Sequence, residues 1–449
     1  MLQGRVQARG SPSEAMRSAP LTRNRSAGEM HMNVFPFACV RPVPDRAAQV
    51  AALPYDVFDR ASARDFVADR PLSFLNIDRP ETQFPLDEDM FAPAVYARAA
   101  TLFASRIEEG VLIRDRRRCF YIYELQQGAH TQRGIVGACA LSDYEGGVIR
   151  RHEATRVAKR DDRVRHIRAL GAQTGPALLA YHDETVLDAI IDAATAAGPL
   201  YRFEDEQGTR QAVWRIDRPE AIEAVRAMFE RVPRAYIADG HHRLAAAARV
   251  GGALRKAAAA SGGLTGTEPF NFILSVLVPA SQLKILPYNR IVSDLGDMDA
   301  TELLESVRAA GFEVESAEEP VEPRAAGIMG MTLRGRWWRL TATERLASEI
   351  GRADAVGALD VSVLQERILG PLLGIDDPRR DGRIRFAGGE AGCAAALERL
   401  TGRDGVAFSV HATAIEQLFA VADAGLLMPP KSTWFEPKLR SGLFAYEIR

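Results

Sequence analysis

Apolar and polar residues follow two different periods along this chain, and together they predict both helices and strands. Apolar positions recur at helical spacing over 87–109. Short apolar runs at 119–125 and 134–141 predict two strands joined as a hairpin through Gln127-Gly128. The same reasoning predicts four further helices, at 184–197, 218–231, 301–310 and 361–373. It also predicts strands at 174–181 and 270–278, an edge strand at 213–216 and a hairpin at 329–340. The pattern indicates the α+β class, with mixed sheets.

The segment Ala235–Leu244 connects a buried strand to a helix through a turn at Asp239-Gly240. His241, His242 and Arg243 therefore fall in the first helical turn, where free main-chain N–H groups and the helix dipole already favour an anion. Three basic side chains at that end cost stability unless a negative group binds among them, and a phosphate fits. An Asp239 N-cap beside solvated basic residues is the alternative, and the spacing leaves both open.

A second unusual segment, Ile149–Arg156, is followed by the charged run Lys159–Arg168. Basic residues dominate both, with acids interleaved, which is typical of a solvated helix face with i, i+4 pairs. Glu153 differs from the other acids, because it stands alone among basic residues at the expected end of a strand. A positioned catalytic carboxylate is therefore the alternative interpretation.

The third unusual segment, Met428–Leu443, places lysines, hydroxyls and aromatic residues between prolines that prevent a regular helix. A rigid loop that presents Lys431, Ser432 and Thr433 to an anion is one interpretation. A proline-stiffened edge strand is the other.

Composition narrows the classes of protein. The 449 residues suffice for two or three domains, and the net charge of −2 argues against a non-specific nucleic-acid binder. Four scattered cysteines with no Cys-x-x-Cys pair indicate a reducing compartment, so we expect a cytoplasmic protein. No apolar run approaches the roughly 20 residues that a membrane span needs. The sequence also lacks the Walker and Gly-x-Gly-x-x-Gly nucleotide motifs.

The composition also suggests three regions. Residues 1–31 are rich in Arg and Ser without apolar periodicity, so we expect a disordered leader, and a mis-set translation start upstream of Met32 is the alternative. Residues 33–294 form the expected N-terminal and core α+β region. A shift in composition after Asp294 predicts a C-terminal α/β region over 295–449.

Several short motifs follow in order along the chain: Phe35-Pro36-Phe37 with Arg41-Pro42, Pro54-Tyr55-Asp56-Val57, His152-Glu153-Ala154-Thr155, Ala238-Asp239-Gly240-His241-His242-Arg243, and Pro430-Lys431-Ser432-Thr433 with Pro437-Lys438. In order and identity they resemble the domain-of-unknown-function 1015 family, from about Asn33 to Arg449. The Asp-Gly-His-His-Arg piece is also similar to free-serine kinases of the ParB/sulfiredoxin-like superfamily, in which the corresponding turn binds nucleotide phosphates at a helix N-terminus. The resemblance implies a ParB/sulfiredoxin-like core.

The resemblance further implies a nucleotide-dependent phosphotransferase that acts on a small hydroxyl substrate, with free L-serine the best guess, and with ATP or ADP and Mg²⁺ as cofactors. A non-catalytic nucleotide-binding regulator is the alternative, since the chain is far longer than a minimal kinase of that type. The metal ligands, the phosphate donor, the acceptor and the oligomeric state stay open. The site residues expected on this basis are Glu153 and Asp239 for catalysis; Gly240, His241, His242, Arg243, Lys431, Ser432 and Thr433 for phosphate; and His152, Thr155, Tyr55 and Asp56 as further pocket candidates.

Overall fold

The computed structural model describes residues 31–389, 392–402 and 404–449. The predicted leader lies outside the described residues, except for its last residue, His31. Met32 is already part of the core: its side chain is fully buried, and its main-chain N–H donates to the Val232 carbonyl at 3.0 Å. Within the described ranges, no helix is both long enough and apolar enough to cross a membrane.

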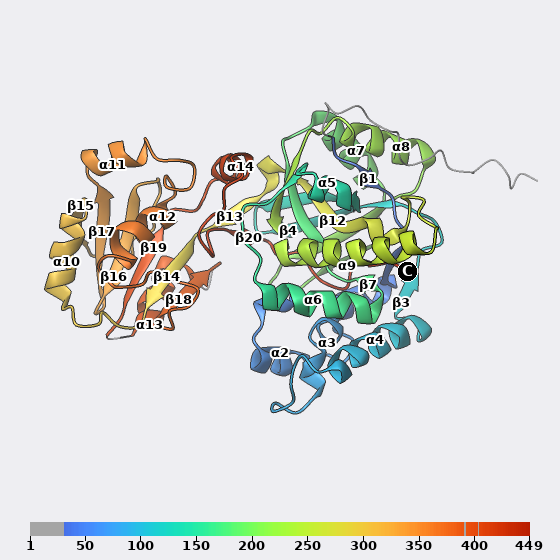
Figure 1. The fold of residues 1–449 in the computed structure, drawn as a ribbon, viewed down its shortest axis with the longest axis horizontal. Coiled ribbons are helices and arrows are strands. Elements are labelled where there is room, and N and C mark those ends of the chain that lie inside the picture. The colour runs from blue at the N-terminus through green and yellow to red at the C-terminus, as the bar shows by residue number, and fades with distance from the viewer. Residues whose placement is uncertain (1–30, 390–391, 403) are drawn as a thin grey trace, which may run out of the picture.

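A mixed sheet forms the centre of the larger lobe (Figure 1). Nine strands of the described chain build it, in the order β6-β11-β8-β12-β5-β4-β10-β9, with β1 beside β5. Most neighbours are antiparallel, but β11 runs parallel to β6 and β12 runs parallel to β8. The bounds are β1 Val34–Phe35, β4 Phe120–Gln127, β5 His130–Ala140, β6 Ile149–Arg150, β8 Ala177–Tyr181, β9 Tyr201–Glu204, β10 Arg210–Ile216, β11 Ala235–Asp239 and β12 Phe272–Pro279.

Pairing in this sheet confirms one prediction and corrects another. Strands β4 and β5 form the predicted hairpin, and Gly128 in its turn has φ of +57°, which favours glycine. The predicted edge position of 213–216 is wrong, because β10 pairs with β4 on one side and with β9 on the other. Strand β9 has four residues, too few for alternation to show in the sequence.

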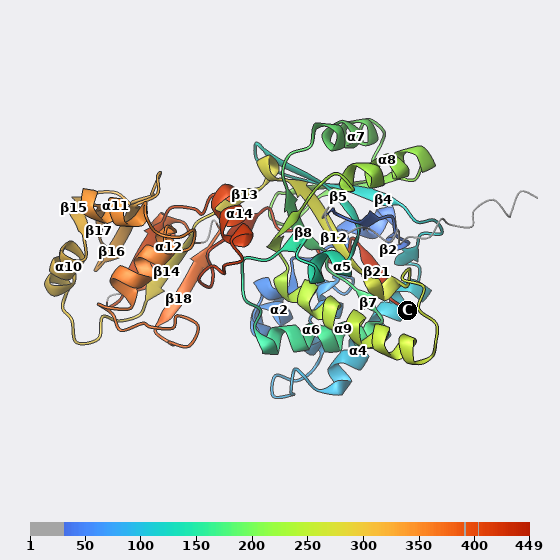
Figure 2. The same cartoon turned by 45° about the horizontal axis from the view of Figure 1, so that its top comes forward.

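Helices cover the sheet on both sides (Figures 1 and 2). Helix α9 (His241–Ala260) packs on β8 and β12, α6 (Val157–Leu170) packs on α9, and α4 (Pro93–Glu108) packs on α6. Helices α7 (Thr185–Thr195) and α8 (Pro219–Phe229) pack together on the other side. Shorter helices of this lobe are α1 Ala47–Val50, α2 Arg60–Val67, α3 Leu75–Asp78 and α5 Leu141–Glu145.

Helices α4 and α6 differ from their predictions. Helix α4 begins at Pro93 rather than at residue 87, because proline favours the first helical position. The solvated face expected for the basic run is wrong in part, since Arg163 and His166 of α6 are buried. The Arg163 guanidinium pairs with Asp162 at 2.8 Å and lies 4.0 Å from the centroid of the Tyr55 ring. Burial of this arginine is therefore compensated by an ion pair and a cation–π contact.

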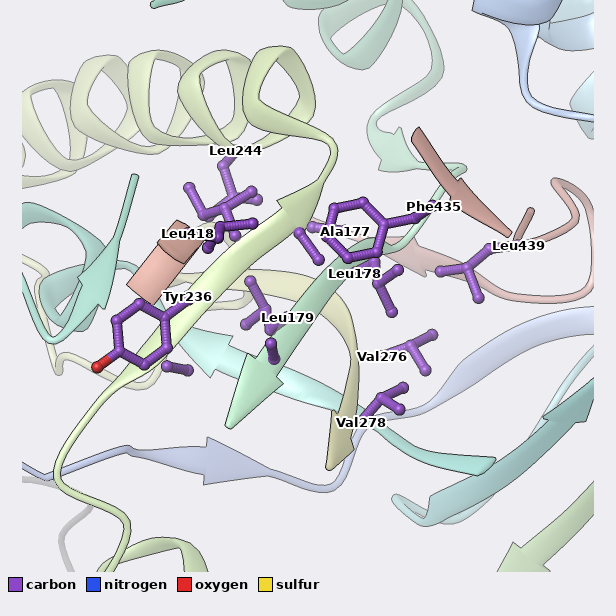
Figure 3. Packing of buried hydrophobic residues seen from close by; sticks show 14 of the residues in the cluster. Ala177, Leu178, Leu179, Tyr236, Leu244, Val276, Val278, Leu418, Phe435 and Leu439 are labelled. Carbon is purple, nitrogen blue, oxygen red and sulfur yellow. The ribbon is translucent and has the colours of Figure 1, made fainter. Parts of the chain in front are cut away.

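The core of the larger lobe extends to the end of the chain (Figure 3). Leu244 of α9 packs with Leu179 of β8 and Tyr236 of β11, and all three are fully buried. Phe435 and Leu439, from the C-terminal segment, join the same cluster. Burial of such a side chain contributes roughly 1.5–3 kcal/mol, so these contacts hold the C-terminal segment against the sheet.

The smaller lobe contains an antiparallel sheet in the order β15-β17-β16-β19-β14-β18 (Figure 1). The predicted hairpin at 329–340 is confirmed by β16 and β17. The helix predicted at 361–373 is too long: α12 ends at Leu364 and continues as a π-helix over Gln365–Leu369, ahead of Pro371. The bounds are β14 Tyr288–Val292, β15 Phe312–Ala317, β16 Ile328–Leu333, β17 Arg336–Ala342, β18 Ile384–Gly388, β19 Val406–Val410, α10 Ala300–Ala309, α11 Glu344–Ile350, α12 Asp360–Leu364 and α13 Ala394–Thr401. Helix α14 (Ile415–Asp423) lies between the lobes (Figure 1), where its Phe419 stacks on Tyr236 of β11.

The C-terminal segment returns from the smaller lobe to the larger one. Strand β20 (Trp434–Glu436) pairs with β13 (Lys284–Leu286), and β21 (Ala445–Glu447) pairs with β2 (Cys39–Pro42) and β7 (Ala172–Gln173). A fourth strand, β3 (Leu112–Arg114), completes that small sheet beside β2. Between them, the fully buried Arg440 donates to Asp205 Oδ2 at 2.6 Å. The division at residue 294 stays a prediction, since β14 precedes it and yet pairs within the smaller sheet.

Candidate functional site

The turn between β11 and α9 has the form expected for an anion-binding helix start. Gly240 is the N-cap residue, with φ of +99°, and no side chain caps the first turn. The predicted alternative, an Asp239 N-cap, is therefore not observed. A Cβ on Gly240 would lie 3.2 Å from the Ala177 Cα, so close packing against β8 also requires glycine here. The uncapped main-chain N–H groups keep their capacity to bind an anion.

The first turn of α9 borders a cavity of about 240 Å³ that also receives residues from the other two unusual segments. Glu153 and the start of α6 at Lys159, the 3₁₀ turn Tyr55–Val57, and the C-terminal segment 431–438 also border it. The predicted site residues that line it are Tyr55, Asp56, Glu153, Asp239, Gly240, His241, His242, Arg243, Lys431 and Thr433. Segments up to almost four hundred residues apart in the chain thus meet at one strand-to-helix turn.

Asp239 is held by two cations. Lys438 Nζ lies 3.2 Å from Asp239 Oδ2, and the Arg243 guanidinium lies 3.6 Å from Oδ1. Burial raises the pKa of this carboxyl, but Lys438 and Arg243 outweigh burial and hold the pKa well below its usual range. Arg243 also donates to the Pro176 carbonyl, which fixes the plane of its guanidinium. Asp239 is thus ionised and neutralised by its neighbours.

The histidines of the motif are neutral at pH 7. His242 Nε2 accepts a hydrogen bond from the main-chain N–H of Arg156 at 2.9 Å, and burial, together with Lys159, lowers its pKa to about 4. His241 is buried against His152, with ring centroids 4.5 Å apart. Burial lowers the pKa of both, that of His152 to about 4. The positive charge around the cavity therefore comes from lysine and arginine.

Glu153 is a half-buried carboxylate that faces these cations. Burial raises its pKa, and the charge of Lys431 opposes that shift. Its side chain makes no hydrogen bond and no ion pair within 4 Å with any other described residue. Burial also lowers the pKa of Lys159, whereas the pKa of Lys431 is raised because Tyr288 outweighs the effect of burial.

Three predicted pocket residues do not line the cavity. Ser432 is buried, and its hydroxyl donates to the Pro429 carbonyl at 2.7 Å, so the structure does not bring this predicted phosphate ligand to the cavity. The left-handed backbone at Lys431, with φ of +61°, turns the chain so that 431 and 433 face the cavity while 432 faces inward. Thr155 lies outside the lining, and His152 lies behind His241.

Lining side chains that the sequence did not predict include Lys159, Tyr288, Trp434 and Lys438. Lys159 and Lys438 belong to two of the unusual segments, but their local sequence does not show which lysine faces the cavity. Trp434 packs edge-on to Tyr288, with ring centroids 5.1 Å apart, and Lys438 Nζ lies 4.8 Å from the centroid of the Trp434 ring. These rings position the lysine at the cavity.

A second cavity, of about 290 Å³, adjoins the first and shares Tyr55, Asp56 and Lys159 with it. Three further aromatic side chains line it: Phe58, Phe91 and Tyr96. Tyr96 is held in place by a hydrogen bond from its hydroxyl to Asp162 at 2.7 Å. The combined volume of the two cavities exceeds roughly 300 Å³, the lower end of the range for small-molecule sites.

Fold and site together define an α+β protein with a cationic cavity at a strand-to-helix turn. A family described as protein of unknown function (DUF1015) matches residues 34–362, and the chain belongs to this family. No curated protein matches the chain.

Three solved structures illustrate the structural comparison. A free serine kinase variant in complex with ADP is 14% identical, over 70% of this chain and 92% of that chain, with a TM-score of 0.34. SbnI with a C-terminal truncation from Staphylococcus aureus is 11% identical, over 69% and 87%, with a TM-score of 0.35. A conserved hypothetical protein from Pyrococcus furiosus is 14% identical, over 69% and 95%, with a TM-score of 0.32.

Proposed function

We propose that this protein is a nucleotide-dependent phosphotransferase that acts on a small hydroxyl substrate, with free L-serine as the first candidate acceptor. One observation carries the proposal. The uncapped first turn of α9, the cations Arg243, Lys431 and Lys438, and the unpaired carboxylate of Glu153 face one cavity. Phosphoryl transfer requires these two kinds of group close together, cations for the phosphates and a carboxylate for the attacking hydroxyl.

The phosphates belong at the start of α9 in this proposal. Main-chain N–H groups of the first turn and the helix dipole attract the anion. Arg243 and Lys438 neutralise Asp239, so this acid does not repel a phosphate nearby. Lys431 reaches the cavity from the C-terminal segment 431–438. It adds a cation that has no acidic partner within 4 Å among the described residues.

The nucleoside belongs in the second cavity. Phe91 and Tyr96 offer flat apolar surfaces for a base, and the shared residues Tyr55 and Lys159 connect this cavity to the phosphate end. Neither cavity alone holds a whole nucleotide and an acceptor, whereas the two together provide separate compartments for them.

Glu153 is proposed to orient the acceptor hydroxyl and to take its proton. As the hydroxyl oxygen forms its bond to the terminal phosphorus, the bond from phosphorus to the bridging oxygen breaks, and the nucleotide leaves with one phosphate fewer. The hydroxyl proton passes to the Glu153 carboxylate. Lys431 and Arg243 stabilise the negative charge that spreads over the transferred group.

The cavity also offers oxygen ligands of the kind that Mg²⁺ prefers. When bound, Mg²⁺ neutralises charge on the nucleotide phosphates. Asp56 fits this role, because its carboxylate faces the cavity and makes no hydrogen bond with the other described residues. Asp239 fits less well, since both of its oxygens already face cations.

Phosphate transfer onto a panel of small alcohols and hydroxy amino acids tests the proposal. Purified full-length protein is incubated with labelled ATP or ADP and Mg²⁺, and the labelled product is separated from the nucleotide. Transfer onto one acceptor, serine first, is the expected result. Nucleotide binding by calorimetry with no transfer onto any acceptor would instead support the non-catalytic regulator.

A further inference from the structure

A cluster of three potential metal ligands lies beside the proposed phosphate site. His152, Glu153 and His241 each offer one ligand atom, and these atoms all lie within 4.8 Å of one another. His152 and Glu153 lie two and three residues after the end of β6, and His241 is the first residue of α9. Strand β6 pairs with β11, which leads into α9, so hydrogen bonds of the sheet hold the two segments together. The cluster is thus built on a rigid frame.

The buried ring of His152 has an unsatisfied nitrogen. This residue is 2% exposed, and its Nδ1 finds no hydrogen-bond partner. Burial lowers the pKa of His152 to about 4, although the main-chain carbonyl of Ile237 lies beside the ring and favours a proton on it. Histidines that bind metals commonly place one ring N–H on a backbone carbonyl and turn the other nitrogen toward the ion.

The ring of His241 is also available. Its Nε2 accepts only a contact of 3.5 Å from the main-chain N–H of His152, which is at the outer limit of a hydrogen bond. The Glu153 carboxylate, the third member, has no hydrogen-bond partner among the described residues. The buried Nδ1 of His152 without a partner costs free energy, and a bound cation would recover that cost.

We propose that His152, Glu153 and His241 bind a divalent transition-metal ion of the zinc class. Two imidazoles and one carboxylate suit zinc or cobalt, whereas Mg²⁺ prefers a set of oxygens. Three protein ligands leave a fourth position open, and two of the three, Glu153 and His241, belong to the cavity lining. The site is distinct from the proposed Mg²⁺ position at Asp56 and needs no nucleotide. Glu153 offers one carboxylate oxygen to the ion, which leaves its other oxygen for the proton of the acceptor hydroxyl.

Cobalt titration of the full-length protein, freed of metal with a chelator and without nucleotide, tests this site. The wild type should bind one Co²⁺ with the intense visible absorption of a four-coordinate ion, and a large excess of Mg²⁺ should not displace it. His241→Ala should weaken Co²⁺ binding at least about tenfold. The control is His182→Ala, an exposed histidine outside both the cluster and the cavity lining, which should leave Co²⁺ affinity unchanged.

Thermal melting of the wild type with and without Zn²⁺ gives a readout that needs no variant. Zinc should raise the melting temperature, since a ligand that binds only the folded state stabilises it. A wild type that shows neither four-coordinate Co²⁺ absorption nor a zinc-dependent shift overturns the proposal. Equal Co²⁺ affinity in the wild type and in a folded His241→Ala variant also overturns it. Because no nucleotide is present, neither outcome bears on phosphoryl transfer.

Discussion

Lys438 Nζ lies 3.2 Å from Asp239 Oδ2, although 199 positions separate the two residues in the chain. This ion pair fastens the C-terminal segment to the strand-to-helix turn. It also leaves the carboxylate neutralised at the place where we propose that phosphates bind. The pair therefore links stability and the proposed function in one contact.

Replacing Lys438 should lower both stability and nucleotide affinity. Lys438→Met retains the apolar stem but leaves Asp239 with Arg243 as its remaining cation, so we expect a loss of about 1–3 kcal/mol in the free energy of unfolding. Denaturant titration measures this loss. Lys256→Met, an exposed lysine on α9, is the control and should change little. An unfolding free energy equal to that of the wild type would contradict the pairing.

Arg243 should not tolerate lysine. The guanidinium is fixed by the Pro176 carbonyl and faces Asp239, and a lysine cannot reproduce its forked geometry. Arg243→Lys should therefore weaken nucleotide binding about tenfold or more, as should Arg243→Ala. Calorimetry with ADP checks this, with Arg249→Lys, an exposed arginine two turns along α9, as the control. Unchanged affinity in both Arg243 variants would remove its phosphate role.

Glu153→Gln should separate binding from chemistry. Glutamine retains the size of the side chain but does not accept the proton, and a general base contributes about 100- to 10,000-fold to the rate. Transfer should fall by that factor in a single-turnover assay with Mg²⁺, while nucleotide affinity and fold stay unchanged. Glu220→Gln, on the exposed face of α8, is the control. A fully active Glu153→Gln protein would leave phosphoryl transfer without this base.

Phe91→Ala tests the assignment of the two cavities. Phe91 lines the second cavity and not the first, so its removal should weaken binding of AMP or ADP. Binding of inorganic tripolyphosphate should stay the same. Stacking on an aromatic ring contributes about 1–3 kcal/mol per base. Equal losses for both ligands would place the nucleoside elsewhere.

Stability should fall as the pH is lowered from about 6.5 toward 4. His166 is buried, and its pKa is lowered first by burial and then by Arg163, although the carboxylate of Asp78, 3.9 Å away, and that of Asp162 oppose the shift. The unfolded chain therefore binds a proton in this range that the folded protein resists, so acid favours unfolding. The denaturation midpoint measured between pH 7 and pH 4.5 should decline less steeply in His166→Gln than in the wild type. As a control, the denaturation midpoint of His411→Gln should decline as steeply as that of the wild type.

The sequence by itself determined most of the local structure around the site. Alternation and helical spacing predicted the β4–β5 and β16–β17 hairpins and the turn from β11 to α9. They did so because short-range periodicity and turn residues such as Gly240 act within a few positions of the chain. The order of the motifs also indicated the family before any geometry was available.

The tertiary structure decided which members of each motif face the cavity. Lys431 and Thr433 line it and Ser432 does not, because a left-handed backbone at 431 turns the hydroxyl of 432 inward. Lys159 and Lys438 became site residues through the packing of α6 on α9 and the return of the C-terminal segment. Arg163 and His166 became buried for the same reason. Such facts depend on contacts between distant segments, and a local pattern of residues carries no information about which segments will meet.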